Sequence, residues 1–193
     1  MSALILGLLM FLGMHSARIL AEGWRSQVIA QRGPGAWKGL YTVVSLVGFG
    51  LIVWGYGQAR QAPQVLWASP VWTRHLASLL VLVAFVLLAA AYVPRNGLKA
   101  RLHHPMVLSV KLWALAHLLA NNTVADVLLF GSFLLWAVLD FRSARQRDRA
   151  AGTVYPAGTV AGTLGAVVVG GVAFVAMAFW GHAWLFGVRP FGA

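Results

Sequence analysis

Residues 104–121 of this 193-residue chain read HPMVLSVKLWALAHLLAN, and this stretch decides the fold. A proline at its second position suits the first turn of a helix, where a missing backbone N–H leaves nothing unpaired. The positions that follow are mostly apolar on every side of the predicted helix, which is typical of a helix surrounded by lipid or packed protein. Lys111 and His117 lie within it, and ionisable groups at membrane depth indicate a functional site because burying them is costly.

Composition predicts an integral membrane protein. The chain is 60% hydrophobic and 10% charged, whereas soluble domains carry about 25% charged residues. Fifteen Lys and Arg against four Asp and Glu give a net charge of +11. These basic residues fall between the apolar runs, so membrane topology explains them better than a nucleic-acid partner. The chain has no cysteine, which excludes disulfides, thiolate metal sites and a cysteine nucleophile.

The apolar runs predict an all-α bundle of about six transmembrane helices, each near the ~20 residues that cross a bilayer. They cover about residues 3–20, 39–56, 74–93, 104–121, 124–141 and 163–180. We expect polar or basic connections over residues 21–38, 95–101 and 142–149. The whole chain, residues 1–193, is predicted to form a single transmembrane domain.

The distribution of basic residues predicts the orientation. The first, third and fifth connections, with Arg18 counted in the first, carry four, three and four basic residues. The opposite connections and the tail carry Arg60, Arg74 and Arg189 between them. The positive-inside rule therefore places the odd connections in the cytoplasm and both termini on the outer side.

Histidines are the main candidates for chemistry. His15 lies in the first span, with Arg18 on the same helix face. His104 and Lys111, seven positions apart, share a face of the central helix. His104 and His117 differ by about 140° and about 20 Å along that helix, so they cannot bind one metal together. A two-histidine site needs a second helix, and His15 is the leading partner.

Haem b matches this set of residues best. It requires one or two axial imidazoles, an apolar pocket and cations for its propionates, and Arg18 and Lys111 are candidate cations. The alternative is that the histidines only form hydrogen bonds between helices, and that Lys111 reaches the interface or pairs with Asp126 or Asp140. No phosphate-binding loop or Ser/His/Asp triad is apparent, so no catalytic residue is predicted and enzyme activity stays open.

Four segments carry a family resemblance. The chain resembles the NnrU family over essentially its whole length, in His15-Ser16-Ala17-Arg18, residues 104–121, Phe130-Gly131-Ser132 and residues 181–187. That family consists of bacterial inner-membrane proteins associated with denitrification. It is also similar to the 15-cis-zeta-carotene isomerase of plants and cyanobacteria, a haem b membrane enzyme that converts a cis double bond to trans.

The resemblance implies roles for particular residues. His15 and His117 match the isomerase histidines implicated in haem ligation, and His104 matches a further histidine. Ala114 stands where the isomerase has a cysteine proposed to switch ligands. The resemblance implies a haem b protein that supports nitrite and nitric oxide metabolism, with a respiratory or denitrification membrane protein as its partner. The alternatives are a haem-dependent polyene isomerase and a non-catalytic assembly factor.

Overall fold

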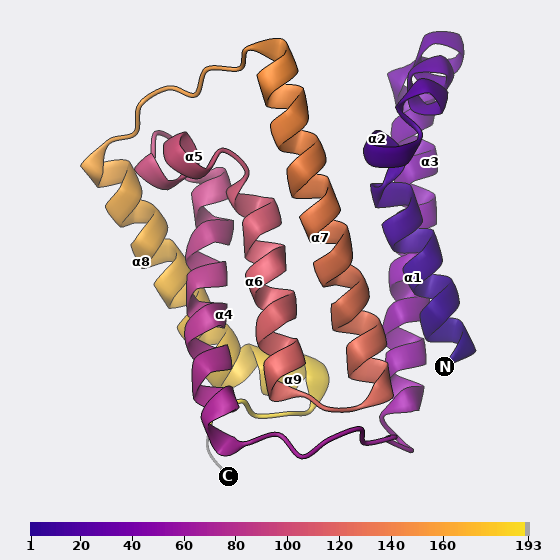
Figure 1. Cartoon of the computed structure of the whole chain (residues 1–193), viewed down its shortest axis with the longest axis vertical. Helices are drawn as coiled ribbons and strands as arrows, with labels where there is room; N and C mark the ends of the chain where they lie inside the picture. Colours follow the sequence, from indigo (N-terminus) through magenta and orange to yellow (C-terminus); the bar gives the residue numbers. More distant parts are fainter. Residues whose placement is uncertain (192–193) are drawn as a thin grey trace. The chain divides into compact units, whose positions relative to one another are not determined.

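The structure, a computed structural model, describes residues 1–191, and its regular elements there are helices (Figure 1). In chain order they are α1 (Ser2–His15), α2 (Ala17–Leu20), α3 (Glu22–Ala59), α4 (Val71–Tyr92), α5 (Gly97–Leu102), α6 (Pro105–Ala120), α7 (Val124–Ala151), α8 (Val160–Ala176), the π-helical turn η1 (Met177–Gly181) and α9 (His182–Phe186). The prediction of an all-α fold is confirmed.

Four helical stretches are long and apolar enough to cross a membrane. They are α3, α4, α7 and the continuous stretch Val160–Phe186. α1 and α6 are also apolar, but they contain 14 and 16 residues. The protein is therefore a helical membrane protein, whereas the count of six spans stays a prediction.

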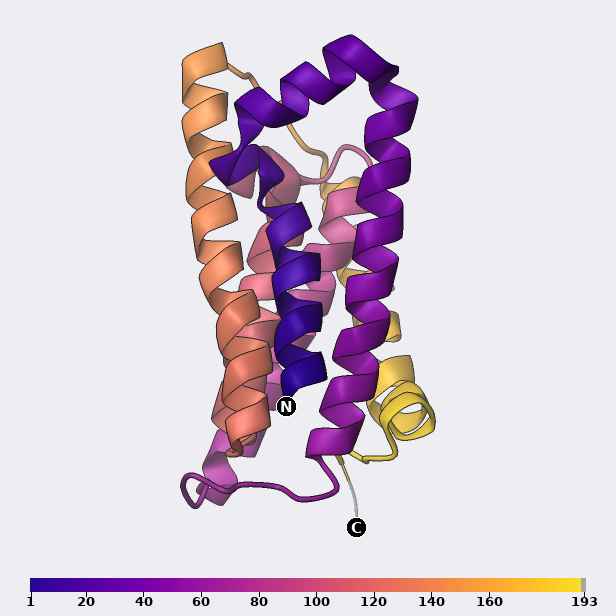
Figure 2. The same cartoon turned by 90° about the vertical axis from the view of Figure 1, so that its right-hand side faces the viewer.

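The connection expected over residues 21–38 is helical instead. α3 begins at Glu22 and bends sharply where Gly33 adopts a φ of 80°, immediately before Pro34 (Figure 2). A positive φ is strained for most residues but costs glycine nothing, so the chain can change direction here without a loop. Trp37, just after the bend, is buried with Met14 and Ala17, and Val28 and Ile29 of the first arm pack against them.

Two further boundaries differ from the prediction. The first expected span, 3–20, is interrupted at Ser16, whose hydroxyl donates a hydrogen bond to the Leu12 carbonyl at 2.7 Å. Such back-bonding bends helices. The expected loop over 142–149 is helical because Arg, Gln and Ala favour helix and no breaker precedes Gly152, which has a φ of 59°. Residues 97–101, also expected in a loop, lie in α5, which continues to Leu102.

The chain separates into two compact units. The first comprises Met1–Ala68 and Asn121–Ser143, and the second comprises Ser69–Ala120 and the described chain from Ala144 onward. α7 contributes to both, its apolar part to the first and its basic last turns to the second.

Within the first unit, α1 and α3 approach backbone to backbone. A Cβ built on Gly55 would lie 2.3 Å from the Leu4 amide nitrogen, and one on Gly7 would lie 2.6 Å from that of Ile52. Leu4 is completely buried at this crossing. Small residues at helix crossings allow this close approach, which membrane helices use because lipid supplies no hydrophobic drive between them.

Within the second unit, α4 packs against both α6 and α8 and lies between them (Figure 1). Gly170 of α8 faces the Val86 backbone of α4. The turn after α4 is held by Asn96, which is 2% exposed. Its amide donates to the carbonyls of Ala90 and Val93, and its oxygen accepts from the Lys99 amide. This turn positions α5 and the start of α6.

Candidate functional site

His15 ends α1 with its imidazole in a defined orientation. Its Nδ1 lies 2.7 Å from the Phe11 carbonyl oxygen, and its ring stacks on the Phe11 ring at 4.1 Å. Because a carbonyl can only accept, Nδ1 carries the proton and Nε2 holds the lone pair. Metal-binding histidines commonly donate their second ring N–H to a backbone carbonyl in this way, which sets the tautomer and the ring direction.

Aromatic rings surround His15 in the first unit, and one of them, Trp136, also lines an apolar groove. The rings of Tyr41 and Trp136 lie 5.0 and 6.0 Å from its ring. The indole Nε1–H of Trp136 is buried and has no hydrogen-bond partner in the described chain. Trp136 also lines a groove of about 310 Å³ along α1 and α7, with Leu12 and Ser132 among its other lining residues. An unsatisfied buried donor beside a groove is consistent with a ligand or water that brings an acceptor.

His117 on α6 repeats the local geometry of His15. Its Nδ1 lies 2.8 Å from the Trp113 carbonyl oxygen, and the two rings are 5.0 Å apart. Nδ1 is again the donor, so Nε2 is again the basic nitrogen. Both predicted haem ligands therefore have an aromatic residue four positions earlier, with the carbonyl of that residue orienting the imidazole.

The two predicted cations have different surroundings. Arg18 forms an ion pair with Glu22 at 3.7 Å, and its side chain is 55% exposed. Lys111 is half-buried on α6. His15 and Arg18 belong to the first unit, whereas His104, Lys111 and His117 belong to the second. Residues 1–191 contain no group of three His, Cys, Asp or Glu side chains arranged to hold a metal ion.

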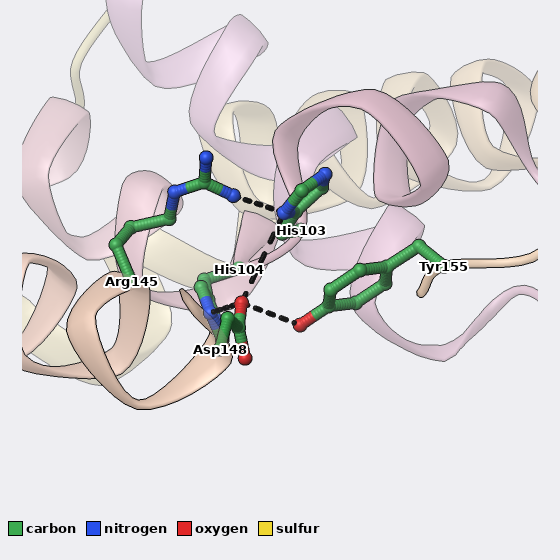
Figure 3. Close-up of polar contacts among 5 residues, drawn as sticks. All are labelled: His103, His104, Arg145, Asp148 and Tyr155. Carbon is green, nitrogen blue, oxygen red and sulfur yellow. Dashed lines mark hydrogen bonds and ion pairs between the residues drawn. The ribbon is translucent and has the colours of Figure 1, made fainter. Parts of the chain in front are cut away.

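His104 contributes to a cluster of five polar side chains in the second unit (Figure 3). We call it the polar cluster; it consists of His103, His104, Arg145, Asp148 and Tyr155. The Asp148 carboxylate is its centre. Asp148 Oδ2 lies 2.7 Å from His104 Nε2 and 3.1 Å from the Tyr155 hydroxyl, which donates to it. The contact ties the start of α6 to the last turns of α7.

His103 occupies a strained turn in the polar cluster. Its φ is 69° and its ψ is −50°, and the His104 amide donates to the Leu102 carbonyl at 2.8 Å across it. This is a γ-turn with positive φ at its centre, a rare conformation for a residue with a side chain. The His103 ring stacks on Tyr155 at 4.2 Å, and its Nδ1 is bonded to Arg145. Such strain persists only where the surroundings impose it, and it concentrates at functional sites.

Ionisation of the polar cluster follows from these contacts. Burial raises the pKa of Asp148, but the hydrogen bonds from His104 and Tyr155, together with the charges of the two histidines, outweigh it and leave that pKa below its usual value. Burial and the bond to Asp148 raise the pKa of the Tyr155 hydroxyl. Asp148 lies in the arginine-rich last turns of α7, after the apolar run over residues 124–141, and Tyr155 lies in the loop that follows this helix. Asp148 is therefore a carboxylate, and Tyr155 a neutral donor, at neutral pH.

Sequence reasoning missed Arg145, Asp148 and Tyr155. It placed residues 142–149 in a basic loop, where a single aspartate carries no positional information. The usable signal was the absence of a helix breaker before Gly152. On a continuous helix, Arg145 and Asp148 are three residues apart and share a face.

A second carboxylate, Asp126, has a structural role in the first unit. It accepts hydrogen bonds from the Tyr56 hydroxyl at 2.5 Å and from the amide and hydroxyl of Thr123 at 2.9 and 2.6 Å. Thr123 precedes α7, and the exchange of bonds between the two side chains caps the start of that helix. These contacts account for a carboxylate that is only 5% exposed.

The fold defines a helical membrane protein, whose second unit carries a small polar cluster between the start of α6 and the last turns of α7. The chain matches the family model of the NnrU protein over residues 3–190, and it therefore belongs to the NnrU family. Comparison with curated proteins found no match, and neither did comparison with solved structures.

Proposed function

We propose that this NnrU protein is a haem b-binding protein of the bacterial inner membrane that supports denitrification, and that His15 and His117 would bind the haem iron. The observation that carries the proposal is the matched geometry of these two histidines. Each donates its Nδ1–H to the carbonyl four residues earlier, so each presents Nε2 as a ligand. A histidine that serves only to join helices has no need for this tautomer in particular.

The residues of the chain fit haem b in three respects. The donor set contains imidazoles and no thiolate. Apolar side chains line the groove bordered by Trp136, whose ring lies 6.0 Å from that of His15, and the unsatisfied Trp136 Nε1–H can donate to a bound polar group. Arg18 can release Glu22 for a propionate because an exposed ion pair contributes only ~0–1 kcal/mol. Lys111, about 9 Å along α6 from His117, is the second candidate cation.

Each residue has a defined role in this proposal. His15 and His117 would bind the haem iron. The backbone carbonyls of Phe11 and Trp113 set the tautomer of these histidines, and the Phe11 ring stacks on the ring of His15. Bound haem supplies an iron centre able to exchange one electron or bind a small ligand. The positive-inside rule places the basic end of α7 and α5 in the cytoplasm and both termini in the periplasm. A respiratory or denitrification membrane protein is the expected partner.

An oxidised-minus-reduced visible spectrum of the detergent-purified protein tests the ligands. We expect a haem b spectrum in the wild type and in His75→Ala, because His75 is exposed at the start of α4. We expect loss or a clear shift of that spectrum in His15→Ala and in His117→Ala. A wild type that is colourless after expression with added haem precursor contradicts haem binding.

Growth on nitrite tests the physiological role. A deletion strain should accumulate nitrite or nitric oxide, and the wild-type gene should restore growth while the two ligand variants do not. If the purified protein is colourless, and if both it and the His15→Ala, His117→Ala double variant fully restore growth of the deletion strain, the protein is instead an assembly factor in which the histidines serve packing.

The groove supports one alternative function, isomerisation of a polyene. It extends along α1 from Ile5 to Ser16, about 16 Å of helix rise, and most of its lining is aliphatic. A long apolar substrate fits such a surface. Incubating the reduced, purified protein with a cis-polyene and analysing the products by chromatography tests it. Unchanged substrate with haem-loaded protein rules this activity out.

A further inference from the structure

The Nδ1 atom of His103 faces two groups of opposite hydrogen-bonding character. Arg145 approaches it with a guanidinium N–H, and Asp148 Oδ2 lies 3.9 Å from the same nitrogen (Figure 3). A guanidinium can only donate, and a carboxylate can only accept. One nitrogen cannot satisfy both, so its protonation state selects the partner.

The contact with Arg145 identifies one state. Because Arg145 donates, Nδ1 of His103 is unprotonated and the ring is neutral, with its proton on Nε2. Adding a proton to Nδ1 removes the acceptor and places two cations in contact. The protonated nitrogen then finds its acceptor in the Asp148 carboxylate.

The backbone around His103 couples this exchange of hydrogen-bond partners to the end of α7 and to the loop that follows it. The γ-turn brings two consecutive imidazoles to the same carboxylate, since His104 Nε2 already bonds Asp148 Oδ2. Tyr155 stacks on His103 and donates to the same oxygen. A change of partner at His103 therefore acts at once on the end of α7 and on the loop after it, where Tyr155 lies.

We propose that His103 is a proton-operated selector that bonds Arg145 when neutral and Asp148 when protonated, and that this exchange moves the last turns of α7 and the loop over residues 152–159. At higher pH, Arg145 is held against the start of α6. At lower pH, Arg145 is released and two imidazoles share one carboxylate. The selector gives the end of the second unit that holds the polar cluster two arrangements, set by the charge of the His103 ring. It operates whether or not haem is bound.

The other charged side chains near the polar cluster do not take the place of Arg145 or Asp148 as partners of His103. Lys99 of α5 donates to the Ala91 carbonyl at 3.0 Å. Arg101 and Arg149 are exposed. The groups that face His103 are Arg145 and Asp148 from α7, Tyr155 from the following loop, and His104 beside it.

Nitrogen-15 NMR of the full-length protein in nanodiscs, with its histidines labelled, tests whether His103 is neutral with its proton on Nε2 when it bonds Arg145. We expect the His103 signals of the Nε2–H tautomer at about pH 8 and of the doubly protonated ring at about pH 5. Assignment uses the His103→Asn variant, which lacks those signals. Asparagine is suitable because it tolerates a positive φ and offers an amide oxygen to Arg145 without titrating. An Nδ1–H tautomer at the higher pH overturns the proposal.

Spin labels test the movement, and the absence of natural cysteine makes labelling specific. Cysteines replace Arg101 and Ala150, both exposed in the second unit. Their distance distribution, measured by double electron–electron resonance, should change between about pH 8 and about pH 5 with the midpoint of the NMR titration. It should not change in His103→Asn, and it should change in the control His75→Asn. Arg145→Gln should reduce the pH-dependent change in the distance distribution, because protonated His103 then has no guanidinium to displace.

Two results overturn the selector. One is a distance distribution independent of pH in the labelled parent protein. The other is the same pH-dependent change in His103→Asn as in the parent, which would place the responsible group elsewhere. Retained helical circular dichroism and size-exclusion profile in each variant establish that it is folded.

Discussion

Replacing Gly55 by alanine should separate α1 from α3 and destabilise the first unit. The added Cβ would lie 2.3 Å from the Leu4 amide nitrogen and 2.8 Å from its Cα, whereas ordinary contact begins near 3.4 Å. The helices must part by about 1 Å at this point, because the obstructing atoms are backbone and cannot rotate away. Overpacking of this kind costs ~1–3 kcal/mol, and a gap of that size also weakens dispersion contacts along the crossing.

Gly50 on the same helix is the matched control, because a Cβ there meets nothing within 4 Å. Alanine gains ~0.5–1 kcal/mol over glycine in a helix, and both variants share this gain. The difference between Gly55→Ala and Gly50→Ala therefore isolates the crossing and should be ~1–3 kcal/mol. Tryptophan fluorescence during denaturation by SDS in mixed micelles measures it. Equal midpoints for the two variants would refute the backbone contact between Gly55 and Leu4.

The second unit supports three further predictions. Asn96→Ala should cost ~1–3 kcal/mol in the same assay, because it leaves buried backbone groups at the end of α4 and start of α5 unpaired. Asp148 has a lowered pKa, so its contribution to stability is complete above its ordinary value of 3.8 and is lost as pH falls through the lower folded value. Thermal midpoints of the wild type should show this acid-side loss, and those of Asp148→Asn should not. Gly170→Ala should destabilise the second unit, because the added Cβ would lie 2.5 Å from the Val86 Cα of α4. Gly171→Ala should leave its stability unchanged by such a clash, because a Cβ there meets nothing within 4 Å.

The orientation of the His15 and His117 rings is an example of what local sequence encodes. The bond from His15 to the Phe11 carbonyl, and that from His117 to Trp113, each join residues four apart on one helix. A helix of known phase places that carbonyl beneath the side chain, so no tertiary contact is needed. The haem ligands themselves stay a prediction, because ligation depends on a cofactor and on two helices from different units.

The polar cluster shows the opposite case. His104 was recognised as a candidate, but its partner Asp148 is 44 positions away along the chain. The pairing requires α7 to continue through its basic turns and to end beside the start of α6. Neither hydropathy nor the family resemblance predicts that α7 continues and ends beside α6. The arginines around Asp148 were interpreted as a cytoplasmic loop, so this aspartate was not considered as a partner for His104.

The sequence by itself determined the helical class, the membrane environment, the family and the helices that carry the candidate histidines. These follow from runs of apolar residues and from spacing along single helices, which neighbouring residues control. The tertiary structure alone decided the bend of α3, the glycine crossing with α1 and the partners of His103 and Asp148. Those features arise because distant backbones approach closely enough to exclude a Cβ or to share one carboxylate, and only the folded chain brings such groups together.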